Sequence, residues 1–120
     1  MDSNLRWVMP DKTILILTVS EYWTWEEMRQ WIKDIGEVLD TCDEPVTVML
    51  DFQYSTYFPK NGVLVIPSII ENIHEKADPI LFVRLSPTHR VVMSVIKSIH
   101  RNIAHKISIL EDVDEMLQQM

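Results

Sequence analysis

The sequence is poor in cysteine and glycine, the residues on which many recognisable sites depend. Its 120 residues include one cysteine, Cys42, which excludes an internal disulfide and a zinc site built from several cysteines. The two glycines, Gly36 and Gly62, are too few for a P-loop or a dinucleotide-binding glycine motif. With 47% hydrophobic and 24% charged residues, the composition is that of an ordinary globular chain, so we expect residues 1–120 to form one domain.

Long apolar runs are also missing. No uncharged run approaches the roughly twenty residues that a membrane-spanning helix needs. The N-terminus lacks the basic start and the apolar stretch of a signal peptide. We therefore expect a cytoplasmic protein without a membrane span.

Acidic residues are absent from one continuous part of the chain. Residues 79–110 contain five lysines and arginines but no aspartate or glutamate. Because the net charge of the whole chain is −7, this window carries +5 and the remainder carries −12. The overall acidity argues against binding to nucleic acid, whereas the separation of charge favours oriented contact with another protein.

Apolar, β-branched runs alternate with helical patterns along the chain. A run without polar alternation, such as Thr13–Val19, is typical of a strand buried on both faces. Thr24 and Glu27 fit a capping box at the start of the clearest helix. We expect strands at Leu5–Met9, Thr13–Val19, Val46–Phe52, Ile80–Leu85 and Lys106–Leu110, and helices at Thr24–Asp40, around Ile66–Lys76 with Pro67 in the first turn, at Pro87–Ile103 and from Asp112 onward.

This alternation predicts an α/β fold in the order β-β-α-β-α-β-α-β-α. Strands that alternate with amphipathic helices form a mostly parallel sheet. The short link 10–12 between the first two strands allows an antiparallel hairpin, so we expect a mixed sheet of four or five strands. In the helix that begins at Pro87, the residues expected to form the buried stripe are Val92, Val95, Ile96, Ile99 and Ile103.

The reactive residue types form no evident catalytic or metal-binding pattern. The four histidines include no i, i+4 pair, and Cys42 lies among acids, a setting that disfavours a thiolate nucleophile. Asp51 ends a predicted strand, where it either serves a function or caps the next turn through its side chain. We therefore predict a protein without enzymatic activity, metal or cofactor.

The helix predicted after Ser86 has a basic face with two interpretations. Arg90, Lys97 and Arg101 recur along one side, which is either a solvated face or a site for an anion or an acidic partner. Free N–H groups and the helix dipole favour anions at a helix N-terminus. The candidate anion-binding residues are Ser86, Thr88, His89 and Arg90.

Two roles are open to the tryptophans that begin the first helix. Trp23 precedes the cap residue Thr24, where it can pack as part of a hydrophobic staple. Tryptophan is also enriched in binding interfaces. We therefore expect any homodimer to be two-fold and centred on exposed Trp23, Trp25 or Met9, with the basic helix at its edge.

The order of elements and several short motifs resemble the STAS family, the fold of anti-sigma factor antagonists and of sulfate transporter cytoplasmic domains. Val48–Asp51 resembles the family's strand that ends in Leu-Asp, and Leu85–Pro87 resembles its later junction of strand and helix. Ile107–Ile109 and Asp112–Leu117 resemble its last strand and terminal helix. The resemblance covers nearly the whole chain and implies one STAS-like domain that works through protein–protein contact.

One STAS motif differs where the antagonists are phosphorylated. In place of Asp-Ser-Ser-Gly at a helix start, this chain has Pro59-Lys60-Asn61-Gly62, so only the glycine matches. Lys60 and Asn61 cannot accept that phosphate. The resemblance therefore implies a stand-alone bacterial module that lacks the switch and regulates through an unidentified protein partner; the alternative is a domain that binds a nucleotide, another anion or a lipid. The candidate partner-binding residues, on a loop expected at the surface, are Tyr54, Tyr57, Phe58, Lys60, Asn61 and Gly62.

Overall fold

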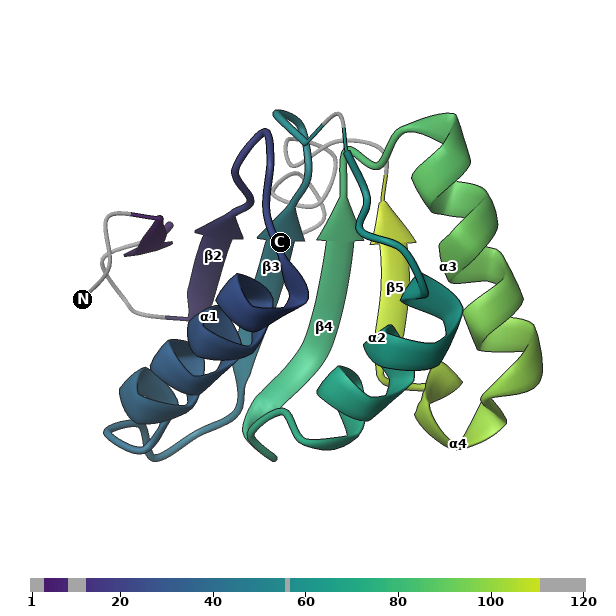
Figure 1. The fold of residues 1–120 in the computed structure, drawn as a ribbon. Helices are drawn as coiled ribbons and strands as arrows, with labels where there is room; N and C mark the ends of the chain where they lie inside the picture. Colours follow the sequence, from purple (N-terminus) through teal and green to yellow (C-terminus); the bar gives the residue numbers. More distant parts are fainter. Residues whose placement is uncertain (1–3, 9–12, 56, 111–120) are drawn as a thin grey trace.

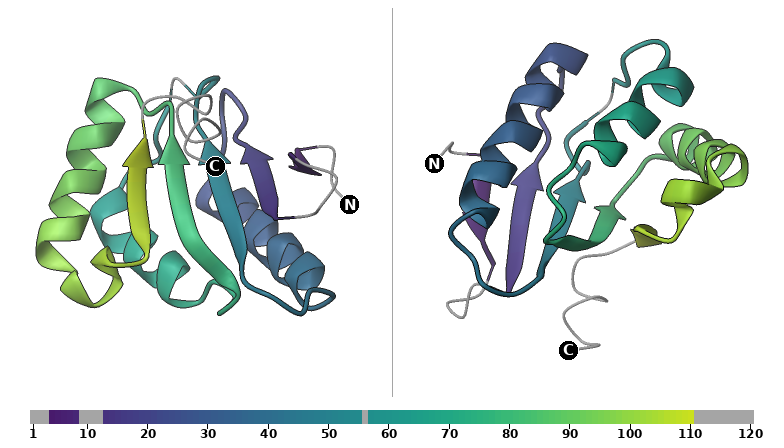
Figure 2. Two further views of the ribbon diagram at one scale, coloured as in Figure 1. Left: turned by 180° about the vertical axis from the view of Figure 1, so that it is seen from behind. Right: turned by 90° about the horizontal axis from the view of Figure 1, so that it is seen from below.

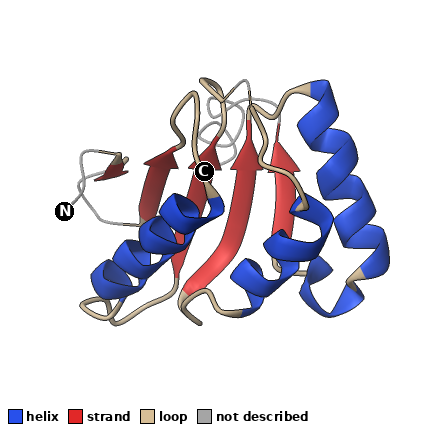
Figure 3. Ribbon diagram, viewed as in Figure 1, coloured by secondary structure: helices blue, strands red, loops and turns tan. Residues whose placement is uncertain are grey.

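The computed structural model describes residues 4–8, 13–55 and 57–110. After an initial pair of strands, helices alternate with strands along the chain, except that two helices precede the last strand (Figures 1 and 3). The strands are β1 (Leu5–Trp7), β2 (Ile14–Thr18), β3 (Val46–Asp51), β4 (Ala77–Val83) and β5 (Ile107–Leu110), and the helices are α1 (Trp25–Leu39), α2 (Gly62–Glu71), α3 (Pro87–Ile99) and α4 (Arg101–Ala104).

The five strands form one mixed sheet in the order β1-β2-β3-β4-β5. β1 runs antiparallel to β2, and each later strand runs parallel to the one before it. This arrangement confirms the predicted α/β fold with a mostly parallel sheet. Because every crossover moves one strand further in the same direction, and such connections are right-handed, the helices between the strands lie on one face of the sheet (Figure 2).

The two faces of the sheet bury separate sets of side chains. Along β2, Leu15 and Leu17 belong to the core beneath the helices, whereas Ile14 and Ile16 belong to a cluster on the opposite face. All four are almost fully buried, as the apolar run without alternation predicts. The other buried members of the opposite cluster are Met49, Leu81 and Val83.

α1 begins where the sequence predicts. The Thr24 hydroxyl accepts a hydrogen bond from the Glu27 backbone N–H at 3.1 Å, and the Glu27 carboxylate accepts one from the Thr24 N–H at 3.2 Å. These two bonds complete the capping box and satisfy two of the N–H groups that a helix start leaves unpaired. The side chains that α1 buries are Met28, Trp31, Ile32, Ile35 and Leu39.

α2 begins earlier than predicted. It starts at Gly62, so that Pro67 lies inside the helix rather than in its first turn. The Asn61 carbonyl accepts a hydrogen bond from the Val65 N–H at 2.9 Å and so establishes the helix before the proline. Proline cannot donate a backbone hydrogen bond, and the helix therefore lacks one bond of its regular series at this point.

The remaining boundaries differ by smaller amounts. β4 begins at Ala77 rather than Ile80, and the third predicted helix is divided at His100 into α3 and α4. The predicted link 10–12 and the terminal helix from Asp112 lie outside the described residues. Within the described segments, no helix is both long enough and apolar enough to cross a bilayer.

The buried side of α3 is rotated away from the predicted stripe. Ile96 and Ile103 are buried as predicted, and Val92 packs against the core. Val95 and Ile99 are exposed instead, and His89 and Met93 are buried in their place. α3 lies at the edge of the molecule beside the last strand, β5 (Figure 1). Its apolar arc is therefore wider than the surface that the sheet and α2 can cover.

Candidate interaction site at the carboxyl end of the sheet

Three loops meet where the parallel strands end. They follow β2, β3 and β4, and they lead into α1, α2 and α3 (Figure 1). In parallel α/β sheets this edge collects functional residues, because each connection from a strand to the next helix starts there. The described residues 19–24, 52–55, 57–61 and 84–86 therefore form the candidate site.

The indole of Trp23 lies at the centre of an aromatic cluster beneath these loops. It is 2% exposed, and its ring centroid lies 5.1 Å from that of Trp25, 5.5 Å from Phe58 and 6.2 Å from Phe52. The pairs with Trp25 and Phe58 are edge-to-face, and such pairs contribute about 0.5–1.5 kcal/mol each beyond area burial. The cluster joins the start of α1 to the loop after β3. Because Trp23 is buried, the prediction that it is an exposed dimer contact is wrong; Met9 lies outside the described residues.

Hydrogen bonds connect the loop after β3 to two indoles. The Trp23 Nε1–H donates to the Ser55 hydroxyl at 2.9 Å, and that hydroxyl donates to the Tyr57 carbonyl at 2.9 Å. The Trp25 Nε1–H donates to the Lys60 carbonyl at 2.7 Å. Ser55 is buried, and its hydroxyl is satisfied inside the protein as both acceptor and donor. The loop is therefore fixed near both of its ends.

Phe58 and Gly62 pack beneath the loop rather than on its surface. Phe58 is half-buried and Gly62 is buried. A Cβ atom at Gly62 would lie 2.5 Å from Cε1 of Phe58, so the absence of a side chain allows the ring to lie against the start of α2. The other four candidate partner-binding residues, Tyr54, Tyr57, Lys60 and Asn61, are exposed.

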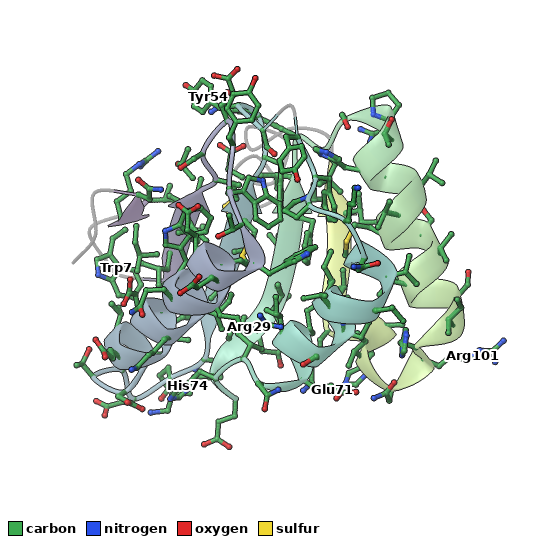
Figure 4. The ribbon with its side chains drawn as sticks, in the orientation of Figure 1. Trp7, Arg29, Tyr54, Glu71, His74 and Arg101 are labelled. Atoms are coloured by element: carbon green, nitrogen blue, oxygen red, sulfur yellow. The ribbon has the colours of Figure 1, made fainter. Side chains whose placement is uncertain are left out.

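Three tyrosine rings form the outer surface of this region, and we refer to them as the tyrosine patch. Tyr22, Tyr54 and Tyr57 are 69%, 59% and 44% exposed. The ring centroids of Tyr22 and Tyr57 lie 6.2 Å apart, and Tyr54 lies at the same end of the molecule (Figure 4). Sequence reasoning missed Tyr22. The available signal was its place after β2, because residues that follow neighbouring parallel strands come together at one edge.

The predicted anion-binding residues do not converge on one site. The Ser86 hydroxyl accepts a hydrogen bond from the His89 N–H at 3.2 Å and so caps α3. Thr88 is exposed and Arg90 is half-buried, but the His89 ring is buried and faces Phe58, with 4.8 Å between the centroids. Its Nδ1 atom has no hydrogen-bond partner among the described residues. Burial lowers the pKa of His89 below its usual 6.5, so it acts as a neutral core residue.

Asp51 takes the structural role of the two that the sequence allows. Its carboxylate accepts hydrogen bonds from the backbone N–H of Gln53 at 3.0 Å and from the side-chain amide of Gln53 at 3.1 Å. Arg84 approaches it to 3.8 Å. Asp51 is buried, so these contacts compensate a charge that would otherwise be costly to remove from water. The first of these bonds caps the turn after β3.

A groove of about 550 Å³ separates α1 from α2. Ile32, Gly36 and Ile69 line it, and at one end His74 contacts Asp40 at 2.8 Å between Nε2 and Oδ1. The remaining lining residues carry charges of both signs or are polar, and they favour no single ligand chemistry: they are Arg29, Lys33, Glu37, Ser68 and Asn72.

Potential metal ligands among the described residues, and comparisons with protein-family models and curated proteins, give no independent indication of function. In the parts of the chain that the structure describes, no three His, Cys, Asp or Glu side chains are grouped to hold a metal ion. No protein-family model and no curated protein matches this chain. The geometry of the tyrosine patch is therefore the main basis for a functional proposal.

Substitution of Gly62 tests whether the packing of Phe58 against the start of α2 stabilises the protein. We expect Gly62→Ala to lower the free energy of unfolding by about 1–3 kcal/mol, because the added methyl group forces Phe58 out of its aromatic contacts. Urea unfolding measures the change, and near-UV circular dichroism should show a weaker aromatic signal.

The other glycine provides a matched control. A Cβ atom at Gly36 would have no neighbouring atom within 4 Å. Gly36→Ala should therefore raise stability by about 0.5–1 kcal/mol, since alanine is the better helix former. Equal effects of the two substitutions would contradict the packing that we describe around Phe58.

The burial of His89 predicts a loss of stability in mild acid. The unfolded chain takes up a proton at this residue near pH 6.5, whereas the folded protein does so only at lower pH. Stability should be unaffected by His89 at higher pH and should fall as the pH drops from about 7 to about 5. Urea unfolding of His89→Leu over the same range should show a smaller fall, because the other histidines are unchanged. An identical pH profile for the two proteins would contradict the prediction.

Proposed function

We propose that this chain is a non-catalytic, STAS-like regulatory module of the cytoplasm that binds a protein partner through the tyrosine patch. One observation carries the proposal. Tyr22, Tyr54 and Tyr57 are exposed together on loops whose inner side contacts the buried aromatic cluster. Tyrosine is enriched among the residues that contribute most to binding in protein interfaces.

The hydrogen bonds that hold the loop after β3 favour a binding role for the exposed tyrosines over a purely structural one. A partner that orders a flexible loop loses part of its binding free energy to conformational entropy. Here the bonds from Trp23 and Trp25 order the loop before any partner arrives. Tyrosine rings add large contact area with few rotatable bonds, and their hydroxyl groups can form hydrogen bonds at the rim.

The residues of the loop after β3 also favour binding that is not regulated by phosphorylation. Lys60 and Asn61 stand at the positions where the resemblance to STAS antagonists would require serines. Ser55, a hydroxyl on the same loop, is buried and hydrogen-bonded to Trp23 and Tyr57, so a kinase could reach it only after the loop had opened. We therefore propose a partner whose affinity does not depend on phosphate in this loop.

Binding of a small anion is the weaker alternative. It would use Thr88 and Arg90 at the start of α3, where backbone N–H groups favour negative charge. Ser86 already caps the helix, and His89 faces the core. Homodimer formation also stays a prediction.

The tyrosine patch can be tested by capture of partners on the immobilised protein. We expect the wild-type protein to capture at least one protein from a lysate of the source cell. The double variant Tyr22→Ser/Tyr57→Ser should retain at least about tenfold less of that protein. Both tyrosines are exposed, so the double variant should unfold at nearly the wild-type urea concentration.

Leu64→Ser provides the matched control. Leu64 is also a large exposed apolar residue, but it lies on α2 outside the tyrosine patch. The control should retain the partner as the wild type does. Equal retention by the tyrosine variant and the wild type would contradict the proposal.

A further inference from the structure

α3 presents an apolar stripe to solvent. Val91, Val95 and Ile99 are exposed, and each lies one helical turn from the next. Large contiguous apolar patches on a protein surface mark interaction sites, and the regular spacing of these three side chains makes the stripe a candidate for one. The stripe borders a shallow groove of about 370 Å³, whose lining also includes Ser94 and Ser98.

The stripe is exposed because of the position of α3 in the fold. The inner side of the helix packs His89, Met93 and Ile96 into the core. None of the described helices or strands covers its outer side, which lies at the edge of the molecule (Figures 1 and 2). We call this side the α3 outer face; its residues are Val91, Ser94, Val95, Ser98 and Ile99.

Cations border the α3 outer face and no acid lies near them in sequence. With about 3.6 residues per turn, Arg90 and Lys97 lie on one side of the two serines while Val95 and Ile99 lie on the other. Arg101 follows just beyond the end of the helix and projects into solvent (Figure 4). Residues 79–110, which contain the whole helix, include no aspartate or glutamate.

We propose that the α3 outer face binds an acidic amphipathic helix of a partner protein. The apolar stripe would pack against the apolar ridge of that helix, and the small side chains of Ser94 and Ser98 would allow its backbone to approach closely. Acidic residues on one flank of the partner helix would pair with Lys97 and Arg101. This surface is separate from the tyrosine patch, so the proposal does not depend on the function proposed above.

A second copy of this chain fits the α3 outer face poorly. In an antiparallel two-fold pair of α3 helices, the basic flank of one helix meets the basic flank of the other, which places like charges together. In a parallel two-fold pair the basic flank meets the apolar flank, which offers no acid. The solvent side of α1 offers the acids Glu26 and Glu37, but Arg29 and Lys33 lie among them. α1 has no large exposed hydrophobic residue to meet the stripe. A different protein with a purely acidic flank is the better match.

A pair of synthetic peptides tests the proposal directly. Both are amphipathic helices of about 20 residues with a leucine ridge; one carries glutamate and the other lysine beside the ridge. Fluorescence anisotropy of the labelled peptides measures binding to the whole protein. We expect the glutamate peptide to bind at least about tenfold more tightly, and salt to weaken it, because exposed charge pairs are screened.

Variants of residues on and beside the α3 outer face test whether the peptide binds there. Val91→Ser/Ile99→Ser should lower affinity for the glutamate peptide about tenfold or more, because the stripe supplies most of the buried apolar area. Lys97→Glu/Arg101→Glu should reverse the preference toward the lysine peptide. All four positions lie at or near the surface, so these variants should fold. Tyr22→Ser/Tyr57→Ser should bind the glutamate peptide as the wild type does.

Several results would overturn the proposal. One is the absence of peptide binding at about 1 mM protein. At that concentration, even a binding free energy of only about −4 kcal/mol would leave half of the peptide bound. Others are equal affinity for both peptides and affinity unchanged by the α3 variants. Sedimentation of the wild type as a dimer that Val91→Ser/Ile99→Ser dissociates would also overturn it, because the occupant would then be a second copy.

Discussion

The hydrogen bond from the Trp23 indole to Ser55 connects the two segments on which the candidate site depends. Trp23 belongs to the turn between β2 and α1, and Ser55 belongs to the loop between β3 and α2. Both are buried, so the Trp23 indole N–H would be left unsatisfied without Ser55, at a cost of about 1–3 kcal/mol. Ser55 also donates a hydrogen bond to the Tyr57 carbonyl. The two bonds of Ser55 therefore connect the buried Trp23 to the backbone of Tyr57, which belongs to the tyrosine patch.

The same sheet topology explains both proposed surfaces. Parallel strands in sequential order bring the loops after β2 and β3 together at one edge, which assembles Tyr22, Tyr54 and Tyr57 from two segments. Sequential order also places α3 at the end of the row formed by α1, α2 and α3, with α2 on one side. Its outer face consequently stays exposed with Val91 and Ile99 on it.

The sequence predicts features that depend on neighbours along the chain better than features that depend on distant ones. The capping box of Thr24 and Glu27 and the burial of β2 on both faces follow from local patterns, and both are confirmed. The pairing of Tyr22 with Tyr57 requires the strand order, which spacing alone does not give. The rotation of α3 is similar: its apolar arc is wide enough for several orientations, and only contact with α2 and the sheet selects the one that exposes Val95.

Hydrogen exchange of the tryptophan indole N–H groups, followed by NMR, tests most directly whether the tyrosine patch is ordered before binding. We expect the Trp23 indole N–H to exchange as slowly as the backbone amides of β3, because its release from Ser55 requires the cluster to open. In Ser55→Ala the same N–H should exchange much faster while the amides of β3 stay protected. Fast exchange of the Trp23 indole in the wild type would contradict this, because the loop would then open readily and the tyrosine patch would not be preformed.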